Sequence, residues 1–214
     1  AIGVFQTQEE IDSYISPATG KPIQPNAAPG DTKFEDLNGD GVISDDNEDR
    51  TMIGKPNPDW MVGLTVAADW NGFDLSAFFQ GSFGADVFDA LRRYELAAVN
   101  YTSDALERWT GPGTSNSMPR IVLGDTPKNF RPSTLLVHDA SFLRLRNLQV
   151  GYTLPAQLTR KAYIQRLRFY ASFDNLLTIT GYKGMDPEIG STMGIDKGVY
   201  PQARVYTFGL NLTF

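Results

Sequence analysis

The feature that most limits the fold is a pair of long alternating segments joined by Asn71-Gly72. Between Trp60 and Trp70 apolar side chains occupy every second position, and the alternation resumes between Phe73 and Phe83. A period of two predicts β-strands, and Asn-Gly favours the type I′ turn that closes a tight hairpin. We therefore expect one long β-hairpin over residues 58–83.

Three further strands are predicted within residues 142–214. They cover residues 142–154, 167–174 and 204–214. Unbroken alternation in the first of them would place these residues on one face: Phe142, Arg144, Arg146, Leu148, Val150, Tyr152 and Leu154. The chain thus supplies five strands.

The connections between these strands alternate between short and long. Those at Asn71-Gly72 and Pro155 are short, whereas residues 5–57, 84–141 and 178–203 form long, polar connections. In an antiparallel up-and-down sheet the two kinds fall at opposite ends, as in outer-membrane barrels with tight periplasmic turns and long extracellular loops. Within the second long loop, apolar spacing over residues 86–110 predicts a short amphipathic helix.

Strand length supports the same fold. Trp60 and Trp70 share a face ten residues apart, a distance of about 25 Å along the axis of a barrel with tilted strands. That distance matches the apolar band between two aromatic girdles. Phe142 and Tyr152 repeat the spacing. The fold class we predict is all-β: the C-terminal strands of a large antiparallel transmembrane β-barrel, residues 1–214, with long extracellular loops.

Composition removes other classes. The net charge is −6, so no basic surface is available for a nucleic acid, and no nucleic-acid partner is expected. Cysteine is absent, which excludes disulfides and thiolate metal sites. Residues 1–5 look like the end of a strand that begins in a preceding segment. Five strands would leave two open edges, which lipid does not tolerate, so we expect a fuller chain or a companion polypeptide.

The end of the chain resembles the C-terminal signal that the bacterial barrel-assembly machinery recognises. The matching residues are Thr207, Gly209, Leu212 and Phe214. An amphipathic strand with free edge groups is suited to pairing with another sheet. If Phe214 lies at the periplasmic rim, counting back along antiparallel strands places all three long loops outside the cell.

An acidic segment in the first loop predicts a calcium site. Its D-x-N-x-D-G pattern begins at Asp36, and Gly41 permits the sharp turn that lets oxygen ligands converge. The expected ligands are Asp36, Asn38, Asp40, the carbonyl of Val42, and Asn47 or Glu48. The alternative is a solvated turn held by side-chain hydrogen bonds to its own backbone.

Catalysis has little support in the sequence, and we expect no enzyme. His138 is the only histidine. Asp186 and Glu188 could in principle form the carboxylate pair of a glycosidase, but adjacent acids in a loop are usually only solvated. The aromatic residues Tyr94, Tyr101 and Trp109 are candidates for contact with a ligand or with a partner that acts as a lid.

Five blocks closely resemble SusC/RagA-type TonB-linked outer-membrane proteins of Bacteroidetes. They are PGDTKFEDLNGDGVI from Pro29, DRTMIGKPNPDW from Asp49, NGFDLSAFFQGSFG from Asn71, FLRLRNLQVGYTLP from Phe142 and DNLLTITGYKGMDPE from Asp174. They cover nearly the whole chain in the family's order. The segment between Asp45 and Arg50 is longer than the family pattern, which puts the last calcium ligand in question.

The resemblance implies a barrel of about 22 strands with a plug in its lumen. It further implies TonB-driven import of oligosaccharides or peptides, with a SusD-like surface lipoprotein as a lid. The partners would then be the rest of the barrel and its plug, that lipoprotein, TonB through the part not included here, and outer-membrane lipid. The alternative is a secreted, calcium-stabilised β-sandwich for carbohydrate binding or attachment, which would need no detergent.

Overall fold

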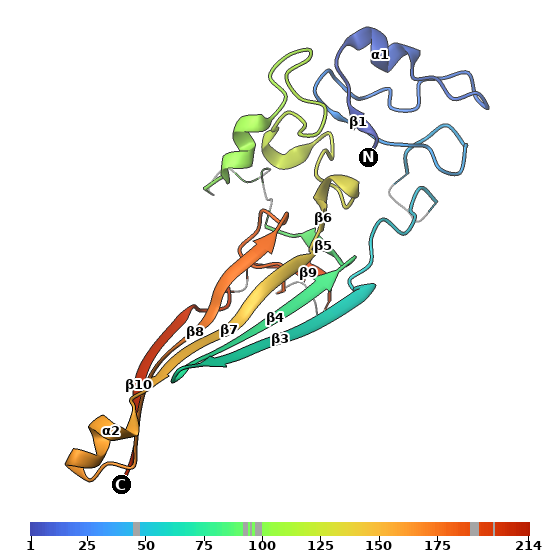
Figure 1. Cartoon of the computed structure of the whole chain (residues 1–214). Helices are drawn as coiled ribbons and strands as arrows, with labels where there is room; N and C mark the ends of the chain where they lie inside the picture. Colours follow the sequence, from blue (N-terminus) through green and yellow to red (C-terminus); the bar gives the residue numbers. More distant parts are fainter. Residues whose placement is uncertain (45–47, 92–93, 95, 97–99, 189–192, 199) are drawn as a thin grey trace. The chain divides into compact units, whose positions relative to one another are not determined.

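The computed structural model describes residues 1–44, 48–91, 94, 96, 100–188, 193–198 and 200–214, and the chain forms two compact units (Figure 1). Unit 1 comprises Ala1–Gly54 and Phe88–His138, and unit 2 comprises Lys55–Val87 and Asp139–Phe214. No helix in the described ranges is long and apolar enough to span a membrane.

Unit 2 is built on a five-stranded antiparallel sheet. Its strands are β3 (Trp60–Trp70), β4 (Phe73–Phe83), β7 (Phe142–Thr153), β8 (Arg166–Thr180) and β10 (Val205–Thr213), in the order β10-β8-β7-β4-β3. The hairpin turn has the positive φ angles that Asn-Gly favours, 48° at Asn71 and 86° at Gly72. The five predicted strands are confirmed.

One face of this sheet is apolar from edge to edge. Directly paired residues share a face, and the pairing carries this surface across all five strands, whose residues are all described. It includes Trp60, Val66, Phe79, Leu148, Phe173 and Leu210 and carries no charged side chain within the strands. Many side chains of this face are exposed: Trp60 is 72%, Trp70 73% and Phe208 76% accessible. In a β-sandwich a second sheet would cover such a face.

A bulge in β7 overturns part of the predicted face assignment. Phe78 pairs with Asn147 but Phe79 pairs with Leu145, so Arg146 is an extra residue in the strand. The alternation therefore changes parity at Arg146. Leu143 and Leu145 join the apolar face, whereas Phe142 and Arg144 lie on the polar face opposite Ser82 and Gln80.

The prediction that Phe142, Arg144 and Arg146 share a face with Leu148 and Tyr152 is therefore wrong. The girdle spacing from Phe142 to Tyr152 is wrong for the same reason. An aromatic row does exist near the end of the sheet that carries the Asn71-Gly72 turn. Its members are Trp70, Phe73, Tyr152 and Phe169, which are consecutive cross-strand partners.

The two kinds of connection lie at opposite ends of the sheet. The Asn71-Gly72 turn, the connection with α2 (Ala156–Thr159) and η4 (Arg160–Ala162), and the end of β10 lie at one end (Figure 1). At the other end, the hydroxyl of Tyr182 donates a hydrogen bond of 2.6 Å to Asp196, and the Tyr182 ring packs with Val87 and Ala140. The long connections are thus ordered where they leave the strands.

Residues 5–57 contain more structure than the predicted loop. In unit 1, β1 (Gly3–Val4) pairs with β2 (Thr32–Lys33), and α1 (Gln8–Ser13) begins at Thr7, whose hydroxyl accepts a hydrogen bond from the backbone of Glu10. Phe5, Ile11, Ile23 and Phe34 are buried. These apolar residues are too widely spaced to show a period, which is why the sequence indicated only a loop.

The amphipathic helix predicted over residues 86–110 is wrong at both ends of that range. Asp86–Asp89 form strand β5, which lies between β6 (Val137–Asp139) and β9 (Ile195–Asp196), and Ser103–Glu107 form a short 3₁₀ helix, η1. Val87 is buried in the core beside Tyr182, so tertiary packing determines the local conformation there. Six of the thirteen residues between these two elements lie outside the described ranges. Two further 3₁₀ turns, η2 (Leu123–Asp125) and η3 (Thr134–Leu136), follow in unit 1.

A buried polar network joins the two long loops inside unit 1. Arg120 donates two hydrogen bonds to the carboxylate of Asp31, of 2.6 and 3.1 Å, and Asn129 donates a third of 3.1 Å. Asn129 also accepts from the backbone of Thr32 at 2.8 Å. Asp31, Thr32 and Asn129 are buried. Residues 1–54 and 88–138 therefore fold as one unit.

Candidate functional site

The face of the sheet opposite the apolar surface is polar and densely hydrogen-bonded. Near the end with the short connections, Arg168 of β8 forms a bidentate ion pair with Asp74 of β4, and one of its nitrogens also donates to Gln149 of β7 at 3.2 Å. In the middle of the sheet, Asn147 donates to Ser172 at 3.1 Å and to Asp174 at 2.7 Å. These groups hydrogen-bond to one another across the strands, so this face of the sheet is polar without being strongly charged.

At the other end of the polar face, Arg144 is enclosed by carboxylates from the loop that follows β8. Its guanidinium donates to Asp186 at 2.6 Å, to Glu188 at 2.9 Å and to the hydroxyl of Thr178 at 2.9 Å. Arg144 is only 2% exposed and Asp186 only 4%. Arg146 forms a second ion pair with Glu188 and donates to Gln80 at 2.6 Å.

The environment of Asp186 argues against an acid–base role. Burial alone would raise the pKa of this carboxyl, but hydrogen bonds from the backbone of Glu188 and Gln202 and from Arg144 lower it below its usual value. A general acid of a glycosidase needs the opposite shift. Glu188 is shared by two guanidinium groups. Asp186 and Glu188 are therefore arranged as structural ion-pair partners and not as a catalytic acid and base.

The predicted calcium loop is folded around its own backbone. Asp36 accepts hydrogen bonds of 2.8 Å from the backbone of Gly39 and of Gly41, and Asp40 accepts one of 2.8 Å from Val42. The Asn38 amide reaches Asp40 at 3.0 Å and Glu48 at 3.4 Å. Asn47 lies outside the described residues.

A residue that the prediction left out closes this loop. Asp49 accepts from the backbone of Leu37 at 3.1 Å and of Ser44 at 2.8 Å. Among the described residues, no group of three or more His, Cys, Asp or Glu side chains is arranged to hold a metal. The turn required for cation binding is present, but it is held by hydrogen bonds that an acidic turn makes in water as well.

Two of the three aromatic contact candidates pack inside unit 1. Tyr94 is 2% exposed and lies in a cluster with Ala105 and Met118, so this side chain cannot contact a partner in this conformation. The Trp109 indole donates to Gln6 at 3.1 Å, and its ring covers Gly30. Tyr101 remains 42% exposed, with its ring against Tyr94.

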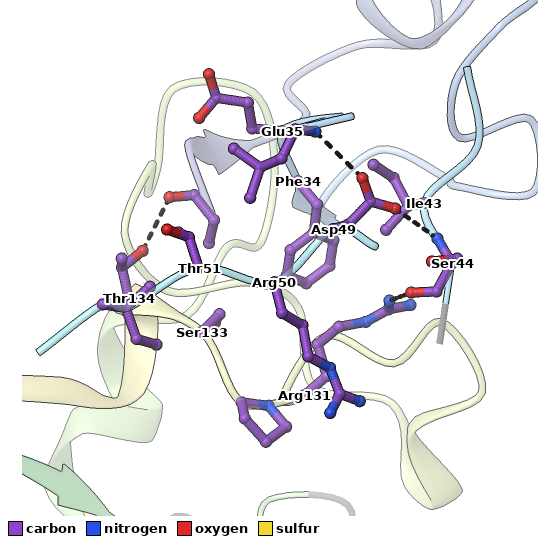
Figure 2. A pocket seen from close by; sticks show the side chains of 14 residues that line it. Phe34, Glu35, Ile43, Ser44, Asp49, Arg50, Thr51, Arg131, Ser133 and Thr134 are labelled. Atoms are coloured by element: carbon purple, nitrogen blue, oxygen red, sulfur yellow. Dashed lines mark hydrogen bonds between the residues drawn. The ribbon is translucent and has the colours of Figure 1, made fainter. Parts of the chain in front are cut away.

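Unit 1 also contains a cavity that the sequence did not predict (Figure 2). Its volume is about 330 Å³, within the range of small-molecule pockets. It is lined by apolar groups such as Phe34 and Ile43, by the guanidinium groups of Arg50 and Arg131, and by hydroxyls that include Ser133. The carboxylates of Glu35 and Asp49 also line it, so the cavity suits a small polar group without a preference for negative charge. No motif could have revealed it, because residues 34–53 and 131–134 meet only in the folded unit.

The terminal strand β10 pairs with β8 through all nine of its residues, Val205–Thr213. Leu210 and Leu212 lie on the apolar face, while Thr207 and Gly209 lie on the polar face. A side chain at Gly209 would collide with the ring of Tyr170, its cross-strand partner, because an added Cβ would lie 2.5 Å from that ring. Gly209 thus has a packing role besides its place in the predicted assembly signal. Phe214 is exposed.

Comparison with known proteins gives a consistent answer. No protein-family model matches the chain. The chain is 34% identical over its full length to TonB-dependent receptor P3 of Formosa agariphila, and 31% identical over 88% of its length to TonB-dependent receptor SusC of Bacteroides thetaiotaomicron. These alignments cover 22% and 18% of the two relatives, so the chain spans about a fifth of their length.

Solved structures agree with these relatives. The alignment with the RagAB peptide importer in its closed-closed state covers 80% of this chain and 19% of the RagAB chain. Its TM-score is 0.66 and the sequence identity is 32%. The RagAB peptide transporter matches 74% with a TM-score of 0.61 and 33% identity. The fold, the apolar face of the sheet and the sequence similarity agree: this chain belongs to the SusC/RagA family of TonB-dependent receptors and corresponds to their C-terminal part.

Proposed function

We propose that this chain forms the last strands of an outer-membrane barrel that imports oligosaccharides or peptides by active, TonB-dependent transport. The observation that carries the proposal is the five-stranded sheet with one exposed face free of charge and one polar face. Lipid would cover the first face, and the second would line the lumen. The family membership supports this assignment.

The sides of the membrane follow from the two ends of the sheet. The short turn at Asn71-Gly72, the α2 connection and the end of β10 would face the periplasm. Unit 1 and the loop between β8 and β10 would face the cell exterior. In this arrangement Thr207, Gly209, Leu212 and Phe214 present an edge strand to the assembly machinery from the periplasmic side.

The whole transporter would need partners outside this chain. A surface lipoprotein of the SusD type would close the extracellular opening, and TonB would act through the plug region, which this chain does not include. The RagAB structures are described as a peptide importer, which supports peptides as one of the two proposed classes of substrate. Tyr101 is the aromatic candidate that remains available for contact with a lid or ligand. No enzymatic role is proposed.

We also propose calcium as a structural ion in the turn at residues 36–49. Asp36, Asn38, Asp40, Glu48 and the Val42 carbonyl supply hard oxygen ligands, and the Asn38 side chain already brings Asp40 and Glu48 together. Terbium luminescence on the purified full-length protein tests this: Asp40→Asn should abolish the calcium-competed signal, whereas Asp104→Asn should leave it. An unchanged signal in Asp40→Asn refutes the site.

Membrane fractionation tests the main proposal. The native protein should appear in the outer-membrane fraction, require detergent for extraction and co-purify with a surface lipoprotein. Uptake of labelled oligosaccharides or peptides should stop when TonB is deleted. Recovery of a monomer in plain buffer would instead favour a secreted β-sandwich.

A further inference from the structure

The loop between β8 and β10 does not extend away from the sheet but turns back onto its polar face. Asp186, in this loop, and Arg144, in the wall, form an ion pair of 2.6 Å that is almost fully buried. Arg144 lies opposite Gln80 and Thr178 on that face. Burying a guanidinium costs free energy unless carboxylates pair with it, so the buried position of Arg144 depends on Asp186 and Glu188 of this loop.

The bulge in β7 provides a second anchor. Arg146 is the extra residue of the strand, and it reaches Glu188, Gln80 and Asn175. Asn175 itself has a positive φ of 53° and donates to the backbone of Ala203, at the far end of the same loop. Glu188 is thus held by two guanidinium groups, that of the bulge residue Arg146 and that of Arg144, two positions before it.

The docked segment extends beyond β7. A cavity of about 170 Å³ is lined by Pro187 and Glu188 on one side and by wall residues on the other. These wall residues include Met61 of β3, Gln80 and Ser82 of β4, and Phe142 of β7. All four lie on the polar face according to the strand pairing. The loop segment therefore lies over the inner side of three strands.

We propose that residues 185–188 are an inward-folded part of an extracellular loop that stays fixed to the lumen wall and narrows the opening there. Arg144 is the positioning residue, and the pair of Arg146 and Glu188 fixes the direction of the segment. This inference rests on the proposed function, which makes the polar face the lumen.

Trypsin treatment of intact cells that carry the full-length protein tests the docking. Lys183 and Lys197 flank the segment, and both side chains are exposed. Each is followed by a glycine, so trypsin can cleave after it. Arg144→Gln should increase cleavage at these lysines at least about tenfold, since it leaves a buried carboxylate without its partner. The double variant Arg144→Gln with Asp186→Asn should return cleavage toward the wild-type rate, because both charges are then removed.

Arg168→Gln is the matched control. It breaks the ion pair with Asp74 on the same face, at the opposite end of the sheet and with no loop attached. Its cleavage rate should equal that of the wild type. The folded barrel is checked in every variant by its faster migration in unheated samples on an SDS gel. If Arg144→Gln does not fold, Asp186→Asn, which changes only the loop, serves as the test variant.

The outcomes separate this inference from the proposed function. Wild-type cleavage rates in a folded Arg144→Gln barrel, or equal acceleration in Arg168→Gln, would overturn the docking. Either result would leave the transporter assignment intact. Cleavage only after the outer membrane is permeabilised would show that the loop is periplasmic, and both the orientation and the inference would then fail.

Discussion

At the scale of single residues, Asp31 determines the stability of unit 1. Its carboxylate receives three hydrogen bonds from Arg120 and Asn129 in the buried junction of the two loops. The hydrogen bonds that Arg120 donates to the Asp31 carboxylate also raise the pKa of Arg120. We predict that Asp31→Ala lowers the free energy of unfolding of unit 1 by about 1–3 kcal/mol, since it leaves the buried amide of Asn129 and the backbone N–H of Ala28 without their acceptor.

Amide hydrogen exchange in the full-length protein measures this loss. Glu10→Ala is the control, because its ion pair with Lys33 is partly exposed and should cost no more than about 1 kcal/mol. Equal effects of the two substitutions would mean that the network around Asp31 is not what holds the two loops together.

The pH dependence of loop docking follows from Asp186. Its pKa is lowered in the folded protein, so its ionised form stabilises the docked loop above the ordinary carboxyl pKa of about 3.9. That contribution is lost as the pH falls through the lowered pKa. We predict constant protection of the Glu188 and Gln202 amides between about pH 8 and pH 5, and a decline only below about pH 4. Hydrogen exchange corrected for intrinsic rates measures it; loss of protection between pH 7 and pH 6 would assign the docking to another group.

Gly209 gives a prediction that separates packing from recognition by the assembly machinery. A methyl group there would collide with Tyr170. Gly209→Ala should reduce the fraction of folded barrel, and adding Tyr170→Ser should restore much of it by removing the ring. The heat-dependent shift on SDS gels measures both. No rescue would indicate that the glycine acts in the recognised signal itself.

At the scale of elements, the bulge in β7 decides which side chains lie on the apolar face, which is the proposed lipid-facing side. Leu145 lies on the apolar face only because Arg146 shifts the alternation. We predict that Leu145→Arg destabilises the inserted barrel by about 1–3 kcal/mol, whereas Ser76→Arg, on the polar face of the neighbouring strand β4, is tolerated. Folding titrations in lipid vesicles measure the difference. Similar results for both variants would support unbroken alternation.

The hairpin of β3 and β4 and the bulge in β7 show which features the sequence could predict and which it could not. The hairpin was readable because period-two alternation and Asn71-Gly72 are local signals. The bulge was not, since it is defined by the pairing of Phe78 and Phe79 with β7. Equally, Arg144 looked like part of an apolar face, although its partner Asp186 lies 42 residues away along the chain.

The fold of unit 1 could not be predicted from the sequence for a related reason. Its stability depends on contacts between residues about 90 positions apart, such as Asp31 and Arg120. Its apolar residues are isolated between polar ones, so no periodic pattern indicates a hydrophobic core. The acidic turn at Asp36 was recognised from its spacing, but the role of Asp49 depends on hydrogen bonds that only the fold reveals.

At the scale of the whole molecule, the two edges of the large sheet determine what the chain can do alone. β3 and β10 each have a neighbour on one side only in that sheet. Unpaired backbone groups cost several kcal/mol each in lipid, so insertion requires strands from the remainder of the barrel on both sides. We predict that residues 1–214 expressed alone aggregate and give no heat-dependent gel shift. The same residues produced together with the preceding part of the protein should form a closed barrel in which cysteines on β10 and on the first strand cross-link. Stable insertion of the 214-residue chain by itself would contradict the barrel, because its edge groups would then have found partners without any other strand.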